Sequence, residues 1–175
     1  MVNLDYRNIY GIVGMIPLRV GNFMESQLTL NFFRQTEKDS DFNELAFKNS
    51  HNSFSAQINN SFNISSTPSI QGELSAFYLS GAIQGIYTIQ HYSNVTAGVK
   101  WQSRDRRMEG GVQVQDIFKT CSVTLKTNWQ NQNLRMHDYA DTPFFRVTFS
   151  YRFGDYSKKE RKEIDKSRFD RYERD

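Results

Sequence analysis

The sequence predicts an all-β fold: an antiparallel, up-and-down transmembrane β-barrel with about 7–8 strands present, as part of a larger barrel. Three observations lead to this prediction. Apolar and polar residues alternate with period two from the first residues to Gly154, and short connections alternate with long ones. In addition, no apolar run approaches the ~20 residues that a transmembrane helix requires.

The composition excludes several other classes of protein. Hydrophobic residues make up 38% of the 175-residue chain and aromatic residues 14%, which suits a sheet with one apolar face and one wet face. The net charge of +3 is spread along the chain, so we expect no nucleic-acid partner. Cys121 is the only cysteine, which excludes an internal disulfide and a zinc site built on several thiolates. We expect neither a metal nor another cofactor.

Each expected strand has one apolar and one polar face. From Phe145 to Phe153 every odd position is apolar or aromatic and every even position is polar, and the same split recurs from Val95 to Trp101. Successive side chains of a strand point to opposite faces, so this pattern indicates strands. The expected strands cover about residues 5–16, 23–36, 50–64, 69–79, 92–102, 109–129 and 142–153.

The sixth expected strand, 109–129, exceeds the ~9–11 residues of one membrane crossing. Its alternation slips near Lys119 and Thr120, as at a bulge or a turn. It is either one strand that projects beyond the membrane or two strands, and two would allow a free-standing eight-strand barrel. A closed bacterial barrel normally has an even number of strands, so an odd count points to missing N-terminal strands.

Short and long connections alternate strictly along the chain. The short ones cover residues 17–22, 65–68 and 103–108, and the long ones cover about 37–49, 80–91 and 130–141. Transmembrane barrels have short periplasmic turns and longer external loops. The long connections are therefore expected on the outside of the cell.

No catalytic site is predicted, and we expect that the chain is not an enzyme. His51, His91 and His137 are far apart and fall in or beside the expected external loops, and no Gly-x-Ser-x-Gly elbow accompanies them. The arginines of the turn at 103–108, next to Trp101, are interpreted as cations at a membrane edge rather than as a nucleic-acid site.

The central assignment is which face meets lipid. In an outer-membrane barrel the apolar face points to lipid and the polar face lines the lumen. Neutral Ser, Thr, Asn and Gln dominate the polar face, and aromatic residues concentrate near strand ends, as in interfacial girdles. The expected lipid-facing residues are Leu74, Val95, Val99, Trp101, Val147, Phe149 and Tyr151. The expected lumen-facing residues are Gln71, Glu73, Lys100, Arg146 and Arg152.

One alternative from a different class stays open. A small soluble or periplasmic β-barrel that binds an apolar ligand inside would show the same alternation, with its apolar face turned inward. Leu74, Val99 and Phe149 would then converge in a dry centre.

Two segments resemble TonB-dependent receptors. Residues 112–120, with Asp-Ile-Phe at 116–118 after an alternating strand, are similar to their penultimate-strand motif. Residues 145–154, with Tyr-Arg-Phe before Gly154, are similar to their last strand. The closing glycine and the charged tail more specifically resemble the Bacteroidota-type outer-membrane β-barrel family, and the resemblance covers about residues 6–154.

The resemblance implies a barrel of about 22 strands, plugged by an N-terminal domain that engages TonB and takes up scarce nutrients. The chain would then be the C-terminal wall in the bacterial outer membrane. Its implied partners are outer-membrane lipid, the missing N-terminal barrel and plug, the outer-membrane assembly machinery, and TonB through the plug. Tyr151 and Phe153 would form part of the signal that this machinery reads. The resemblance implies no catalytic residue.

Two regions are expected. Residues 1–154 form the barrel segment, and residues 155–175 form a charged, partly helical periplasmic tail. Ser157 and Glu160 have the spacing of a capping box, which indicates a short helix start.

Overall fold

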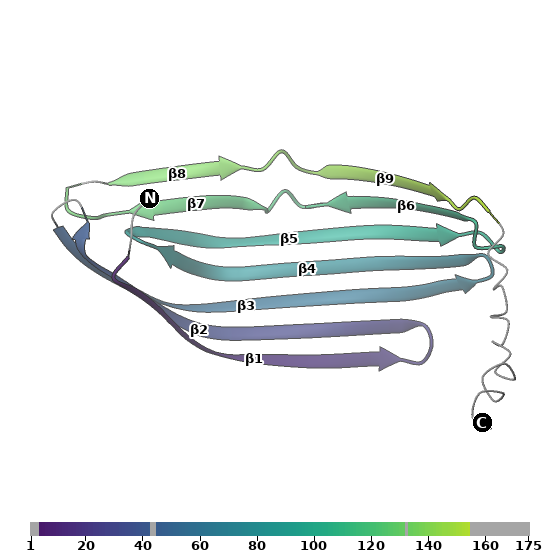
Figure 1. Ribbon diagram of the computed structural model, residues 1–175, viewed down its shortest axis with the longest axis horizontal. Helices are drawn as coiled ribbons and strands as arrows, with labels where there is room; N and C mark the ends of the chain where they lie inside the picture. Colours follow the sequence, from purple (N-terminus) through teal and green to yellow (C-terminus); the bar gives the residue numbers. More distant parts are fainter. Residues whose placement is uncertain (1–3, 43–44, 132, 155–175) are drawn as a thin grey trace, which may run out of the picture.

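A computed structural model describes residues 4–42, 45–131 and 133–154, which form one antiparallel sheet (Figure 1). The expected periplasmic tail lies outside the described residues. Within the described part, no helix has the length and hydropathy to span a bilayer. The strands are β1 (Tyr6–Val20), β2 (Met24–Phe42), β3 (Leu45–Ser66), β4 (Ser69–Gln84), β5 (Tyr87–Gln102), β6 (Met108–Gln115), β7 (Ser122–Thr127), β8 (Leu134–Tyr139) and β9 (Phe144–Tyr151).

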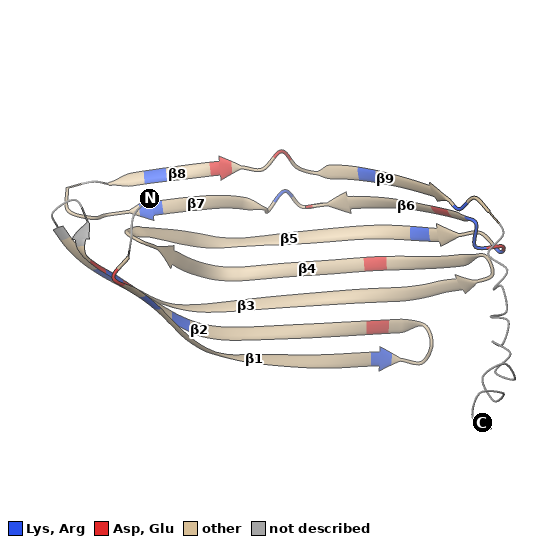
Figure 2. Ribbon diagram, in the orientation of Figure 1, with Lys and Arg blue, Asp and Glu red and all other residues tan. Residues whose placement is uncertain are grey.

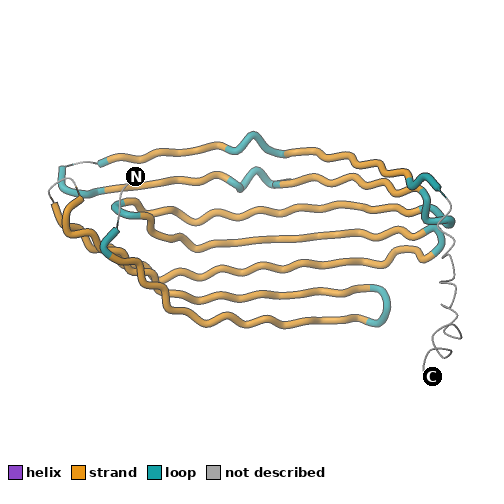
Figure 3. Tube along the Cα trace, viewed as in Figure 1, coloured by secondary structure: helices purple, strands orange, loops and turns teal. Residues whose placement is uncertain are grey.

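The nine strands form seven rows across the sheet. The order is β1-β2-β3-β4-β5-β6-β9, with β7 between β5 and β8. Figure 3 shows β6 and β7 end to end along β5, and β8 and β9 end to end beside them. Residues 109–129 are therefore one interrupted strand. Because β6 and β7 share one row, the described residues do not provide the eighth crossing of a free-standing eight-strand barrel.

The connections predicted as long loops are mostly strand. β2 continues to Phe42 and β3 begins at Leu45, while only Gly85 and Ile86 separate β4 from β5. β8 occupies half of the expected loop at 130–141. The loop prediction was wrong because polar residues on both faces were taken as a loop signal. A hairpin that projects into water keeps its backbone ladder with both faces wet.

The sheet has no apolar core of its own. Among the described residues, Phe47 and Ile83 are the buried large apolar side chains. Leu74 is 39% exposed, Val99 48% and Phe149 70%, so the three do not converge in a dry centre. The soluble-barrel alternative requires such a centre, and the structure removes its basis.

The sheet does not close on itself. Of the described strands, β1 pairs only with β2, while β8 and β9 each pair with one neighbour. Figure 1 places β1 and the β8–β9 row at opposite edges of the sheet. Both edges therefore carry backbone groups without a strand partner.

Candidate functional site: an apolar belt and a polar face

Cross-strand register places the apolar positions of successive strands on one face. Gly72 lies opposite Val99, Val99 opposite Val112, and Val112 opposite Val147. Two residues further along each strand, the next line of paired positions across the strands contains Leu74, Ala97, Val114 and Phe145. We call this face of β4, β5, β6 and β9 the apolar belt.

The predicted lipid-facing residues all lie on the apolar belt. Val95 pairs with Ala76, Trp101 with Gly110, Gly110 with Phe149, and Met108 with Tyr151, which continues the same set of positions. Val147 is 76% exposed and Phe149 70%. The register thus brings together the residues that the alternation selected.

The opposite face, which we call the polar face, collects the predicted lumen-facing residues. Glu73 lies opposite Gly98, which lies opposite Gln113, which lies opposite Arg146. The neighbouring line of paired positions runs from Gln71 through Lys100 and Gly111 to Thr148. These two lines alternate with the lines of the apolar belt, because successive side chains of a strand point to opposite faces.

The charges of the polar face are mostly paired across strands. Lys100 Nζ lies 2.6 Å from Glu73 Oε1, and Arg152 Nη2 lies 2.6 Å from Glu109 Oε1. Glu73 faces Gly98, which has no side chain, so the diagonal lysine reaches it. Charges at membrane depth are tolerated when they face water or a partner, and each of these four charges has a partner.

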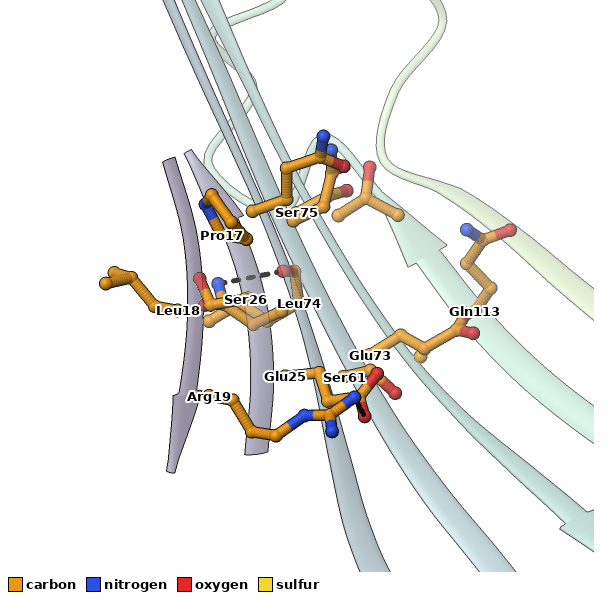
Figure 4. Close-up of a pocket in the computed structure, with 15 residues that line it drawn as sticks. Pro17, Leu18, Arg19, Glu25, Ser26, Ser61, Glu73, Leu74, Ser75 and Gln113 are labelled. Atoms are coloured by element: carbon orange, nitrogen blue, oxygen red, sulfur yellow. Dashed lines mark hydrogen bonds and ion pairs between the residues drawn. The ribbon is translucent and has the colours of Figure 1, made fainter. Parts of the chain in front are cut away.

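A groove runs over the polar face from β1 to β6, with a volume of about 900 Å³ (Figure 4). Its lining is rich in amide and hydroxyl groups, including Gln27, Asn59, Ser75, Thr96 and Gln113. Arg19 Nη2 donates to Glu25 Oε1 at 2.6 Å at one end of the groove. Neutral donors and acceptors of this kind hold water and polar solutes.

Asp116 links the break between β6 and β7 to the break between β8 and β9. Its carboxylate accepts hydrogen bonds from the Thr120 backbone N–H at 2.8 Å, the Cys121 backbone N–H at 3.1 Å and the Thr142 hydroxyl at 2.6 Å. Asp116 is fully buried, with φ +54°. Thr142 lies in the break between β8 and β9, so one carboxylate fixes two adjacent breaks, visible as paired kinks in Figure 3. Sequence patterning located this segment but not its role.

A second buried carboxylate, Glu37, fixes the β4–β5 tip. Its carboxylate accepts hydrogen bonds from the Gly85 backbone N–H at 2.5 Å and from Gln35 Nε2 at 2.6 Å, and Arg7 Nε lies 3.2 Å away. Gln35 Nε2 also donates to the Ile83 carbonyl at 2.8 Å. Sequence reasoning missed this network. Polar residues with period two at 35, 37 and 39 were the available signal.

His91 and His137 lie on strands although their segments were expected to be loops, whereas His51 lies in a strand as expected from the segment 50–64. His51 is in β3, His91 in β5 and His137 in β8, where its Nδ1 shares a hydrogen bond with the Thr124 hydroxyl. In the described part of the chain, no group of three or more metal-binding side chains comes together.

The end of β9 carries the two predicted assembly-signal residues. The rings of Tyr151 and Phe153 meet edge to face with centroids 4.6 Å apart, and Phe153 is 83% exposed. The aromatic pair therefore lies at the strand end: Tyr151 is the last residue that pairs with β6, and Phe153 follows it outside the pairing.

An up-and-down antiparallel sheet with an exposed apolar belt on one face and paired charges on the other is the wall of a membrane-spanning β-barrel. The chain belongs to the outer membrane protein beta-barrel family, whose model matches residues 1–151. It is accordingly a protein of the bacterial outer membrane. No curated protein and no solved structure gave a significant match.

Proposed function

We propose that this chain is the C-terminal wall of a TonB-dependent-receptor-like barrel of Bacteroidota type, which takes up nutrients across the outer membrane. In this proposal the apolar belt contacts lipid and the polar face lines the lumen. The remaining partners are an N-terminal barrel and plug, TonB acting through that plug, and the assembly machinery that reads Tyr151 and Phe153. The tail at 155–175 is periplasmic, and the chain catalyses no reaction.

The open sheet is the observation that carries the proposal. Water is absent from the bilayer core, so each unpaired backbone N–H or C=O there costs several kcal/mol, about 2–7 per group. β1 and β9 leave such groups along their free edges. Pairing of both edges with further strands would satisfy these groups, and the open sheet therefore favours a large barrel over a barrel formed by these seven rows alone.

The polar face supports a wide, wet lumen. A small barrel fills its interior with side chains, whereas a large one encloses water or a plug. Here the polar face carries a groove lined by neutral amides and hydroxyls, together with paired charges such as Glu73 and Lys100. Both suit a water-filled passage for polar solutes.

Cross-linking in the full-length protein tests the open edge. In a Cys121→Ser background, the pair Val112→Cys with Val147→Cys is the positive control, because these residues face each other across β6 and β9. The test pairs combine Val147→Cys with Ile12→Cys, Gly14→Cys or Ile16→Cys in β1. A Cβ at Gly14 meets no atom within 4 Å, so a cysteine fits there.

A short bifunctional thiol reagent is expected to join the control pair within one chain and none of the β1–β9 pairs. Efficient joining of any β1–β9 pair within one chain would mean that the seven rows close on themselves, and the large-barrel proposal would be wrong.

Uptake measurements test the transport part separately. Cells with and without the full protein are compared for uptake of ferric citrate, cyanocobalamin and maltoheptaose, with and without a protonophore. We expect at least one probe to enter faster in cells that hold the protein, and only while the proton gradient is intact. If each of the three probes entered cells with and without the protein at the same rate, the nutrient-uptake role would be overturned. The cross-linking result would be unaffected.

A further inference from the structure

A separate cavity lies at the turn end of the sheet, where the β3–β4 and β5–β6 turns meet. We call it the turn-end cavity; its volume is about 440 Å³. Arg104 and Arg106 line it together with Ser65, Ser66 and Thr67. Figure 2 shows the basic β5–β6 turn in blue, beside the end of the β3–β4 hairpin. Among the described residues, no aspartate or glutamate lines the cavity.

The one acidic residue of the β5–β6 turn is engaged elsewhere. Asp105 Oδ1 accepts hydrogen bonds from the Ser103 hydroxyl at 2.5 Å and from the Arg107 backbone N–H at 3.2 Å. The hydrogen bond from Ser103, followed by that from the Arg107 backbone, holds the pKa of Asp105 below its ordinary value. Asp105 thus stays ionised as part of the turn.

Arg104 and Arg106 keep their charges available to the cavity. Neither forms an ion pair with a carboxylate of the described residues. The turn that carries them is ordered by hydrogen bonds from the Arg106 N–H to the Ser103 carbonyl and from the Ser103 N–H to the Met108 carbonyl, both 2.9 Å. The two guanidinium groups are therefore presented by a fixed backbone.

We propose that the turn-end cavity is a binding site for an oxyanion of the phosphate class. A guanidinium group offers a planar fork of N–H donors that matches phosphate oxygens, and hydroxyl groups add further donors. The cavity also includes Gln71 of the polar face, so it opens toward the lumen side of the sheet. A soluble phosphate-bearing anion and a phospholipid headgroup share this chemistry. The site does not depend on the nutrient-uptake role.

Arg107 provides a matched control. It belongs to the same turn and carries the same charge, but it does not line the cavity, and its charge acts on Asp105. Replacing any one of the three arginines with glutamine removes one positive charge from the turn. A general effect of charge would weaken binding equally in all three variants. A larger effect at Arg104 and Arg106, which line the cavity, than at Arg107 therefore indicates a site with defined geometry.

The experiment uses the full-length protein in phosphatidylcholine nanodiscs and measures inorganic phosphate binding by calorimetry. We expect saturable binding, a rise in Kd of roughly tenfold or more for Arg104→Gln and for Arg106→Gln, and less than about a twofold rise for Arg107→Gln. Absence of saturable binding, or an equal loss in Arg107→Gln, would overturn the proposal.

Two further arms complete the test. Arg104→Lys and Arg106→Lys keep the charge but lose the fork, so we expect a Kd between those of the wild type and the glutamine variants. Where a glutamine variant fails to assemble, the lysine variant is compared with the wild type and should still show a raised Kd. In nanodiscs that contain phosphatidylglycerol, loss of inorganic phosphate binding by the wild type would mean that the lipid headgroup occupies the site. Retained phosphate binding would mean that the ligand of the site is a soluble anion. Lysine variants that bind no better than the glutamine variants would contradict the site.

Discussion

The apolar belt and the projecting end of the sheet are built from the same kind of strand but held by different interactions. In the belt, Val147 and Phe149 are exposed and the order comes from the backbone ladder. In the projecting end, which comprises residues 35–42, 45–53 and 81–90, the fully buried side chains of Gln35 and Glu37 are polar and bind backbone groups. The backbone ladder orders the first region, whereas specific hydrogen bonds from buried side chains add to the order of the second.

This difference has a physical origin. Apolar side chains in hydrocarbon need no partner, so the belt tolerates many apolar sequences as long as no charge enters it. A hairpin in water gains nothing from lipid, and it keeps a fixed position only where buried polar groups are satisfied. Substitutions should therefore act through charge in the belt and through lost hydrogen bonds in the projecting end.

The largest effect is expected for a charge in the belt. Val147→Arg places a cation toward lipid and should lower the free energy of unfolding by about 2–4 kcal/mol near the bilayer middle. Thr148→Arg lies on the polar face opposite Gly111 and should change it by less than about 1 kcal/mol. Urea titration of the full protein in lipid vesicles measures both. Equal losses would show that the two faces are wrongly assigned.

Removal of the Asp116 carboxylate comes next. Asp116→Ala leaves the Thr120 and Cys121 N–H groups and the Thr142 hydroxyl without their acceptor, and should lower the free energy of unfolding by about 2–3 kcal/mol. Thr142→Val removes only one of these bonds and should cost about 1 kcal/mol. The same urea titration compares them, and a loss in Asp116→Ala no greater than in Thr142→Val would refute the role of Asp116 as the joint acceptor.

A local effect is expected at the β4–β5 tip. Glu37→Ala removes the acceptor of the Gly85 N–H and should raise the exchange rate of that amide by roughly tenfold, about 1.4 kcal/mol of local protection. Glu25→Ala, which breaks an exposed ion pair with Arg19, serves as the control and should leave Gly85 unchanged. Hydrogen exchange followed by mass spectrometry of the tip peptide measures the change. Unaltered exchange in Glu37→Ala would mean that the tip is held by other contacts.

The smallest effect is expected for the polar-face ion pair of Glu73 and Lys100. Both side chains are substantially exposed, and exposed pairs contribute about 0–1 kcal/mol. A double-mutant cycle with Glu73→Gln and Lys100→Met should give a coupling energy within that range that falls as salt is added. A coupling energy of about 3 kcal/mol or more would indicate that this face is dry.

Period-two alternation was enough to predict the seven rows and the division into two faces, because both follow from the backbone geometry of each strand alone. The pattern at 145–153, for example, predicted β9 and the faces of its side chains. The breaks at Asp116 and Thr142 coincide only because β6 pairs with β9, which no single strand encodes. The Glu37 network joins residues 48 positions apart, and its polar sequence looked like a loop.

The assignment of one face to lipid and the other to water is tested most directly by measuring the environment of single side chains along β5. This strand is an interior strand that is paired on both sides. Spin labels at residues 95, 96, 97, 99 and 100 of the full protein in lipid vesicles are compared for collision with oxygen, which concentrates in lipid, and with a water-soluble nickel complex. We predict that oxygen dominates at Val95, Ala97 and Val99, and that the nickel complex dominates at Thr96 and Lys100. A uniform or inverted pattern would contradict the claim that the apolar face meets lipid.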